Sequence, residues 1–393
     1  MKQFQFYLTT MIRPFFIGLL ALAAIVFILG FKLGSLTPGF SQNEINQRVK
    51  TSNIDVIAEN PVYAPHSIGQ FALQSLGKTS PLAMRTISAA FAVLSIFAFY
   101  LLVRTWHTNR IAAFTTVLYA SSAWFLHTAR VATPEILFTL FPILFLLWAW
   151  LLKQERRGLS FLLAAIACAF IVYIPGMVWF LLIGLVWQAK RIARELRNVS
   201  SWYVVLCWFV GIALISPLAY AAYQNPNVLR TIAGLPSEMP RIIDFGKNLV
   251  STLSAFIYKG PNDPGMWLGR LPLLDVFTAA MAIVGIYAYR YRLKLDRTIL
   301  TTGALILSVV LVALHGPVSI AILLPLMYLF AASGIAFMLQ QWFTVFPRNP
   351  VAHYIGAGLM AVAIFATVFY HVNHYFIAWP NTPETRTTYN QQP

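Results

Sequence analysis

Side chains that could carry out acid–base chemistry are few, and several of them lie in one polar stretch of the chain. Only 12 of the 393 residues are Asp or Glu, and Glu44, Asp55 and Glu59 all occur in the polar segment 37–85 that follows the first apolar run. A carboxylate can take the proton of an attacking hydroxyl group, and a nearby cation can stabilise a leaving phosphate. We therefore predict that this segment holds the reaction centre, with Glu44 as the candidate base. The alternative is that Glu44 is an ordinary surface charge.

The elements that must position this segment are membrane helices. Hydrophobic residues make up 59% of the chain and charged residues 10%, and the mean hydropathy is +0.70. Apolar runs of roughly 17–22 residues recur, and each is long enough to cross a hydrocarbon core of about 30 Å as a helix. The composition predicts an all-α polytopic membrane protein with about eleven transmembrane helices. The predicted spans are 14–34, 86–103, 111–127, 135–152, 159–174, 176–188, 202–222, 272–289, 298–314, 318–339 and 353–372. The Pro175-Gly176 break leaves a re-entrant pair as an alternative for the fifth and sixth runs.

Short basic clusters between these runs predict the orientation. The formal charge is +16, but the basic residues form no contiguous domain, which argues against nucleic-acid binding. When the spans alternate, the clusters 104–110, 153–157, 190–197 and 290–297 all fall on one side, which the positive-inside rule makes cytoplasmic. We expect a multi-pass protein of the plasma (inner) membrane with a cytoplasmic N-terminus, a retained first helix and an outer C-terminus. Cys168 and Cys207 lie in apolar runs, so neither a disulfide framework nor a thiolate metal site is predicted.

The same alternation gathers the long polar loops on the outer face. These are segments 37–85 and about 223–271, with the turn 128–134 and the segment 315–319. In the first loop, SQNEINQRV and APHSIGQFALQSLG each have the pattern of a short interfacial helix. Such helices could form a platform for a lipid head group, or they could only plug the end of the bundle. The second loop has an amphipathic stretch at 242–257, and Asp263 is among its candidate lining residues.

Several short motifs follow one another within residues 14–152. Asn43-Glu44 follows the first helix, residues 60–66 read Asn-Pro-x-Tyr-x-Pro-His, Arg85 opens the second helix, Ser-x-Trp-Phe-Leu-His-x-x-Arg ends the third, and Glu135 opens the fourth. This order resembles the GT-C membrane glycosyltransferases of the protein O-mannosyltransferase and aminoarabinose-transferase type, often called family 39-like. The resemblance implies a GT-C bundle with interfacial helices in its first outer loop.

The resemblance also implies a reaction. It is the transfer, with inversion, of a hexose or pentose from a polyprenyl-phosphate donor to an acceptor glycan, lipid or protein at the outer (periplasmic or extracellular) face. The acidic residue that acts on the acceptor hydroxyl and the second acidic residue near it match Glu44 and Glu135, and the basic residues that face the donor phosphate match Arg85 and Arg130. The chain departs from the family in having Asn43-Glu44 where members often have an Asp-Glu pair, and its segment HGPVSIAILLP lacks an expected arginine.

Each candidate also has a simpler explanation. Glu135 could act only on the dipole of the helix it precedes, and Arg85 and Arg130 could extend to the outer interface. His66 and His127 could ligate a metal with Glu44, or could be hydrogen-bonded structural groups. No cofactor is required by this chemistry, and a divalent cation is the open alternative. The predicted substrate-binding residues are Arg85, Arg130, His66, Asn43, Tyr63 and His127.

We expect one membrane domain over residues 1–393. Its best-matching part is 14–152, followed by further helices in 153–375 and a polar tail, 376–393, too short to fold alone. The alternative functions are a lipid flippase or small-solute transporter, and a catalytically inactive relative that binds polyprenyl phosphate. The middle of the spans has almost no ionisable residues and no internal repeat is visible, which argues against transport.

Overall fold

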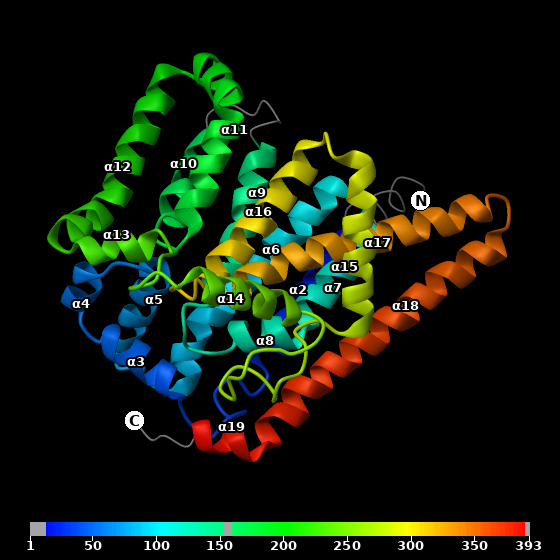
Figure 1. Ribbon diagram of the computed structural model, residues 1–393, viewed down its shortest axis with the longest axis horizontal. Coiled ribbons are helices and arrows are strands. Elements are labelled where there is room, and N and C mark those ends of the chain that lie inside the picture. The colour runs from blue at the N-terminus through cyan, green and yellow to red at the C-terminus, as the bar shows by residue number, and fades with distance from the viewer. Residues whose placement is uncertain (1–12, 152–158, 390–393) are drawn as a thin grey trace, which may run out of the picture.

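The computed structural model describes residues 13–151 and 159–389, and within these ranges every regular element is a helix (Figure 1). The long helices run through the molecule, with shorter helices at their ends. The α-helices are α2 (Arg13–Gly30), α3 (Gln42–Lys50), α4 (Ile54–Glu59), α5 (Ala64–Ser75), α6 (Pro81–Trp106), α7 (Asn109–Ser121), α8 (Ala123–Ala129), α9 (Ile136–Leu151), α10 (Leu159–Ile171), α11 (Met177–Asn198), α12 (Ser201–Gln224), α13 (Pro226–Ile232), α14 (Ile242–Ser254), α15 (Val276–Tyr289), α16 (Asp296–Ala313), α17 (Leu323–Val345), α18 (Pro350–Asn373) and α19 (Pro383–Thr388). Short helical turns η2 (Arg290–Arg292), η3 (Ile320–Ile322), η4 (His374–Ala378) and η5 (Trp379–Asn381) join some of them.

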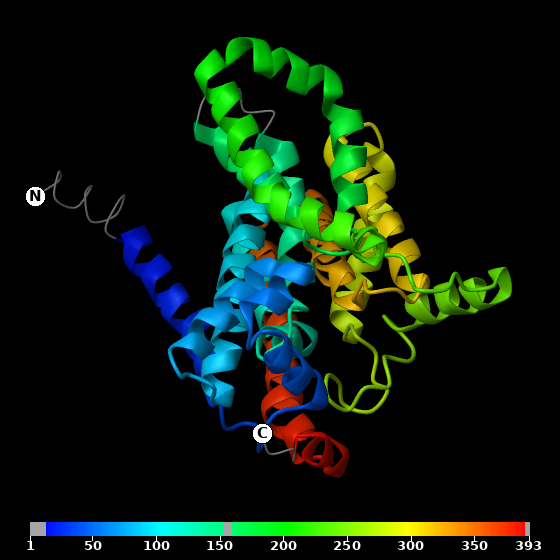
Figure 2. The same ribbon diagram turned by 90° about the vertical axis from the view of Figure 1, so that its left-hand side faces the viewer.

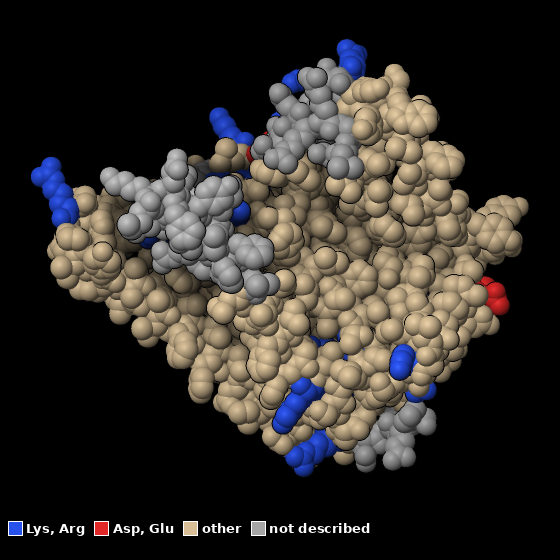
Figure 3. Space-filling model, turned by 180° about the vertical axis from the view of Figure 1, so that it is seen from behind, with Lys and Arg blue, Asp and Glu red and all other residues tan. Residues whose placement is uncertain are grey.

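The protein is an integral, multi-pass membrane protein. Five helical segments of the described chain are long and apolar enough to cross a bilayer, and four shorter apolar helices accompany them. Of the five, the segment Ile320–Val345 is the most buried and lies at the centre of the bundle. Seen from behind, the surface is a broad expanse without charge, and Lys and Arg side chains appear mainly toward its rims (Figure 3). Such an uncharged expanse suits contact with hydrocarbon.

Each of the eleven predicted runs contains a helix, but two predictions of extent were wrong. The run 111–127 is broken at Ser122, whose hydroxyl accepts a hydrogen bond from the Phe125 backbone nitrogen and so starts the separate helix α8. The sixth run continues to Asn198, well beyond the predicted 188. Its additional turns carry polar and basic residues, which a hydropathy criterion excludes although a helix beyond the hydrocarbon accepts them. The break at Pro175-Gly176 is present, with Gly176 at a φ of +77°.

The first polar loop folds into three short helices rather than two. The two predicted interfacial segments correspond to α3 and α5, and α4, which was not predicted, lies between them. Asn53 starts α4 by accepting a hydrogen bond from the Asp55 backbone nitrogen. The amphipathic stretch in the second loop forms α14, which projects sideways from the bundle in Figure 2 and exposes Ile242, Ile243 and Val250.

The polar tail was predicted to be too short to fold alone, and its described part packs against the rest of the protein. The Trp379 and Tyr389 side chains are both 1% exposed. The Tyr389 hydroxyl donates to the Gly265 carbonyl at 2.7 Å, and the Trp379 indole donates to the Pro264 carbonyl at 3.1 Å. The tail is therefore held to the second outer loop by aromatic residues, whose buried area compensates for its polar composition.

Two glycines allow the tightest helix crossing in the bundle, between α15 and α17. A Cβ atom added at Gly285 would lie 1.9 Å from the Phe330 carbonyl oxygen, and one added at Gly334 would lie 1.9 Å from that of Met281. Because the atoms in the way are backbone atoms, no side-chain rotation can relieve the overlap. Small residues let helix backbones approach closely in membranes.

We predict that Gly285→Ala separates α15 from α17 and destabilises the protein by at least about 1–3 kcal/mol, the usual cost of overpacking. Thermal unfolding of the purified protein in detergent measures the effect. Gly303→Ala on α16 is the matched control, since an added Cβ there meets no atom within 4 Å. Equal unfolding midpoints for the two variants would contradict the prediction.

Candidate functional site

Glu44 is held at the start of α3 by local sequence. Ser41 precedes the helix, and its hydroxyl accepts a hydrogen bond from the Glu44 backbone nitrogen, while Glu44 Oε2 accepts one from the Ser41 backbone nitrogen at 2.9 Å. This reciprocal arrangement is a capping box, which satisfies two backbone donors at a helix start. It also fixes the direction of the Glu44 side chain, which points into the protein and is fully buried.

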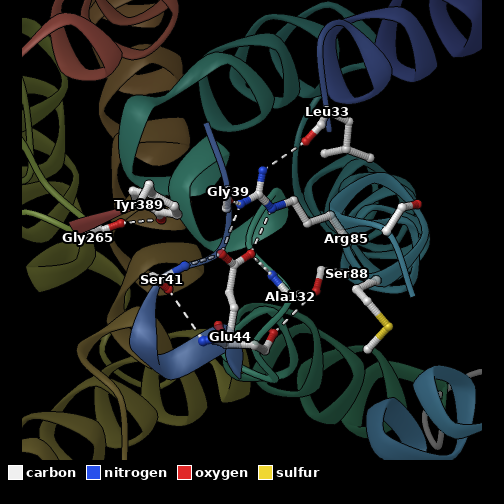
Figure 4. Close-up of polar contacts among 12 residues, drawn as sticks. Leu33, Gly39, Ser41, Glu44, Arg85, Ser88, Ala132, Gly265 and Tyr389 are labelled. Atoms are coloured by element: carbon white, nitrogen blue, oxygen red, sulfur yellow. Dashed lines mark hydrogen bonds and ion pairs between the residues drawn. The ribbon is translucent and has the colours of Figure 1, made fainter. Parts of the chain in front are cut away.

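The buried Glu44 carboxylate forms a two-point ion pair with Arg85 (Figure 4). Arg85 Nε donates to Glu44 Oε1 at 2.7 Å and Nη2 donates to Oε2 at 2.9 Å. Arg85 also donates to the carbonyls of Leu33 and Gly39, at 3.2 and 2.8 Å. Glu44 Oε1 further accepts from the Ala132 backbone nitrogen at 2.9 Å. The pair thus joins the end of the α2 region, α3, α6 and the turn after α8.

This geometry changes the expected roles of both residues. Glu44 was predicted to face an acceptor and Arg85 a donor phosphate, but here each side chain is enclosed by the other and by backbone groups. Neither residue lines a pocket that opens at this face. Both oxygens of the Glu44 carboxylate are hydrogen-bonded, so the pair holds the first outer loop against α6.

A polar cavity of about 440 Å³ lies next to this ion pair. Three segments that were predicted to share one membrane face meet there: the first outer loop, the turn after α8 and the loop before η3. We call this cavity the Glu135 pocket. Its lining includes three predicted site residues, Asn43, Tyr63 and Glu135, together with Asn46, Gln47, Lys50, Thr133, Pro134, Phe138 and residues 316–319.

Glu135 is the carboxylate that lines this pocket. Burial and, to a lesser extent, the nearby Asp263 carboxylate raise its pKa to about 7, against the opposing effect of the Ser319 hydroxyl. A carboxyl group with a pKa near the working pH can exist in its basic form and still accept a proton readily. Of the two carboxylates predicted to be catalytic, Glu135 is the one that lines this pocket.

Tyr63 and Lys50 form the wall beside Glu135. Tyr63 adopts a left-handed backbone conformation with a φ of +66°, and its hydroxyl donates to the Pro317 carbonyl at 3.1 Å. Burial and the Glu135 charge both raise the pKa of the Tyr63 hydroxyl, which stays protonated. Lys50 Nζ lies 6.0 Å from the centre of the Tyr63 ring and donates to the Val62 carbonyl at 3.3 Å. Burial lowers the pKa of Lys50.

A smaller cavity of about 80 Å³ adjoins the Glu135 pocket, and both are lined by Asn43 and Thr133. Asp263 lines the smaller cavity, and its Oδ1 accepts from the Gly265 backbone nitrogen at 3.0 Å. Thr388 of the C-terminal helix α19 closes the same cavity. The second outer loop and the tail therefore complete the wall next to Asn43.

The other predicted residues lie outside both cavities. Arg130 donates to the Ile28 and Phe31 carbonyls at the end of α2 and lies 4.7 Å from the centre of the Phe376 ring. His66 Nε2 lies 2.9 Å from the Ser88 hydroxyl oxygen, and burial lowers the pKa of this imidazole to about 3, so it is neutral at pH 7. The His127 ring packs against the rings of Trp267, Tyr375 and Trp379. All three residues are in structural contacts.

Residues 13–151 and 159–389 contain no group of three or more His, Cys, Asp or Glu side chains placed to hold a metal ion. Of the candidate ligands with Glu44, His66 contacts Ser88 through Nε2, and His127 packs in a group of aromatic rings with neither ring nitrogen hydrogen-bonded. The cation that the pocket itself supplies is Lys50.

Lys50 was missed by the sequence analysis, although a signal was present. Asn43, Asn46 and Lys50 are spaced three and four residues apart, so they share one face of α3. That face lines the Glu135 pocket, while Glu44 points to the protein interior. The predicted helix over SQNEINQRV contained this pattern, but only arginines were considered as phosphate ligands.

Comparison with known proteins agrees with this architecture. Residues 68–220 match the family model described as dolichyl-phosphate-mannose-protein mannosyltransferase. ArnT from Cupriavidus metallidurans in the apo state is similar over 94% of this chain and 76% of its own, with a TM-score of 0.54 and 14% identity. The chain has a GT-C glycosyltransferase fold.

The same ArnT bound to undecaprenyl phosphate is similar over the same shares of the two chains, with a TM-score of 0.52 and 12% identity. The comparison with curated protein sequences gives no match. The family match includes Glu135 but begins after α3, so the Asn43 and Lys50 wall lies outside it.

We predict that Glu44→Gln leaves Arg85 as an uncompensated buried charge and destabilises the protein by about 3–5 kcal/mol. The double variant Glu44→Gln/Arg85→Met, which removes both charges, should recover part of this loss because no charge then stays buried unpaired. Thermal unfolding in detergent compares the two. A double variant no more stable than Glu44→Gln alone would contradict the structural role of the pair.

Proposed function

We propose that this protein transfers a sugar from a polyprenyl-phosphate donor to an acceptor hydroxyl at the outer face of the plasma membrane, with inversion at the anomeric carbon. The observation that carries the proposal is the Glu135 pocket, a polar cavity of about 440 Å³ that places a carboxylate with a pKa of about 7 and a lysine in one GT-C fold. Carboxylate, cation and hydrogen-bonding amides are the groups that glycosyl transfer from a phosphate requires.

In the proposed reaction Glu135 is the general base. The acceptor oxygen attacks the anomeric carbon while its proton moves to the Glu135 carboxylate, and the bond between that carbon and the donor phosphate oxygen breaks. The products are the glycosylated acceptor and polyprenyl phosphate, so charges and atoms balance. Since a phosphate is a good leaving group, no second acid is needed to protonate it.

Lys50 is the proposed partner of the donor phosphate. It is the cation of the pocket, whereas Arg85 is bound to Glu44 and Arg130 to backbone carbonyls. Its lowered pKa reflects burial without an anionic partner, and an incoming phosphate would supply that partner. The hydroxyl of Tyr63 and the amides of Asn43, Asn46 and Gln47 are suited to hydrogen bonds with a sugar.

The Asn43-Glu44 departure from the family pattern has a clear consequence in this assignment. The residue of the pair that lines the pocket is Asn43, and Glu44 is turned into its ion pair with Arg85. The first outer loop therefore contributes an amide where the family pattern offers a carboxylate, and Glu135 has to act as the base alone.

Two further observations support the proposed orientation in the membrane and the proposed lipid partner. Basic residues such as Arg104, Arg110 and Arg290 lie at helix ends remote from the Glu135 pocket, which by the positive-inside rule favours an outer location for the pocket. The similar ArnT has been solved bound to undecaprenyl phosphate, and a polyprenyl chain can lie between membrane helices.

We predict that Glu135→Gln slows sugar transfer about 10²–10⁴-fold, the usual effect of losing a general base. For the wild type, turnover should rise with pH around a midpoint near 7, because the basic carboxylate form appears above that pKa. Transfer of label from a panel of undecaprenyl-phosphate sugars, in membranes with matched protein levels, measures both. Glu59→Gln, on an exposed residue of the first outer loop, is the control.

The folding stability of Glu135→Gln shows whether a loss of turnover comes from the missing base or from unfolding. A raised pKa means that ionising Glu135 costs folding free energy as pH rises from about 4.5 toward 7. Glu135→Gln should therefore be at least as stable as the wild type at pH 8. Wild-type turnover by Glu135→Gln would remove its catalytic role, and an inactive wild type that still binds undecaprenyl phosphate would favour the inactive lipid-binding alternative.

We predict that Lys50→Gln weakens binding of undecaprenyl phosphate by about tenfold or more, since a charge-assisted contact is lost. Titration of the purified protein with this lipid provides the measurement. Lys78→Gln, in the same loop but away from the pocket lining, should bind as the wild type does. Unchanged binding by Lys50→Gln would show that another group holds the phosphate.

A further inference from the structure

A second and larger cavity, of about 1250 Å³, lies at the other end of the helices from the Glu135 pocket. Helix α6 begins near the Glu44–Arg85 pair and ends at Trp106, and Trp106 lines this second cavity. Its walls come from the junction of α6 and α7, the end of α15, the second half of α17 and the first half of α18. We call it the opposite-end cavity.

The ionisable nitrogen-containing side chains of this lining are basic, and they lie among neutral polar residues. Arg110, Arg297 and His107 line it, and no Asp or Glu is among its described lining residues. Arg297 donates to the Trp106 carbonyl at 3.3 Å, and His107 Nε2 lies 3.3 Å from the Ser333 hydroxyl oxygen, so both are oriented by the protein. Two arginines together suit an anion, and guanidinium groups hold phosphate oxygens well.

Much of the remaining lining is apolar, beside neutral polar residues such as Asn109, Gln340 and Gln341. Ile111, Phe114, Phe337 and Met360 contribute to it, and α18 runs outward at an angle from α17 in Figure 1. A basic end joined to an apolar wall fits an amphiphile with an anionic head and hydrocarbon chains. The first twelve residues of this chain are a poor candidate to occupy the cavity, because they carry Lys2 and no acidic residue to pair with its arginines.

We propose that the opposite-end cavity binds an anionic diacyl phospholipid of the surrounding membrane, with its phosphate against Arg110 and Arg297 and its chains along Phe114, Phe337 and Met360. Basic pockets between membrane helices recognise anionic lipid head groups in this way. The site is distinct from the Glu135 pocket and does not depend on the proposed reaction.

The test is native mass spectrometry of the delipidated full-length protein titrated with phosphatidylglycerol and with phosphatidylcholine of the same chains. The wild type should prefer phosphatidylglycerol by about tenfold. Arg110→Gln should lose most of that preference, and Ala336→Phe, which places a ring in the cavity, should reduce binding without changing any charge. Arg230→Gln, on an exposed arginine of α13, should behave as the wild type.

Equal binding of the two phospholipids by the wild type would overturn the proposal, and so would an unchanged preference in Arg110→Gln. Undecaprenyl phosphate provides the remaining arm of the experiment. If it binds the Lys50→Gln protein more tightly than phosphatidylglycerol does, and adding Arg110→Gln to that protein abolishes the difference, the cavity is a polyprenyl-phosphate site and the assignment to a diacyl phospholipid is wrong.

Discussion

The buried ion pair between Glu44 and Arg85 is the contact on which the arrangement of the outer loops depends. Removing two charges from water is costly, and the cost is met here because the pair makes two parallel hydrogen bonds and backbone groups satisfy further donors and acceptors. Arg85 belongs to a long helix, whereas Glu44 belongs to a short one. The pair therefore ties a short helix of the first outer loop to a long helix of the bundle.

The orientation of α3 follows from this attachment. With Glu44 directed inward, the face with Asn43, Asn46 and Lys50 is directed into the Glu135 pocket. Gln47 strengthens the same arrangement, since its amide donates to Ser67 and Gln70 of α5, and Gln70 in turn donates to the Ala132 carbonyl. The pocket is thus a product of helix orientation, and its carboxylate comes from another segment, the turn that leads into α9.

The Glu135 pocket and the opposite-end cavity lie at opposite ends of a core built around α17. The close crossing of α15 and α17 at Gly285 and Gly334 fills the space between the ends with backbone and apolar side chains. Charged groups are consequently confined to the ends of the helices, where water or lipid head groups can solvate them. The Glu135 pocket is lined by a carboxylate, Glu135, and a lysine, Lys50. The opposite-end cavity is lined by basic side chains, with no Asp or Glu among its described residues.

The sequence by itself determined the helices and the end of the bundle at which the polar segments meet. Apolar length sets the spans because each must cross the hydrocarbon, and the alternation of spans brings residues 43–63, 133–135 and 316–319 to one face. Only the tertiary structure decided which charges pair. Glu44 and Arg85 are 41 residues apart, and nothing in the local pattern of either distinguishes a buried pair from a base and a phosphate ligand. The inclusion of Lys50 in the pocket and the burial of Tyr389 beneath the second outer loop were likewise decided by contacts between distant segments, because a side chain's environment depends on what packs against it.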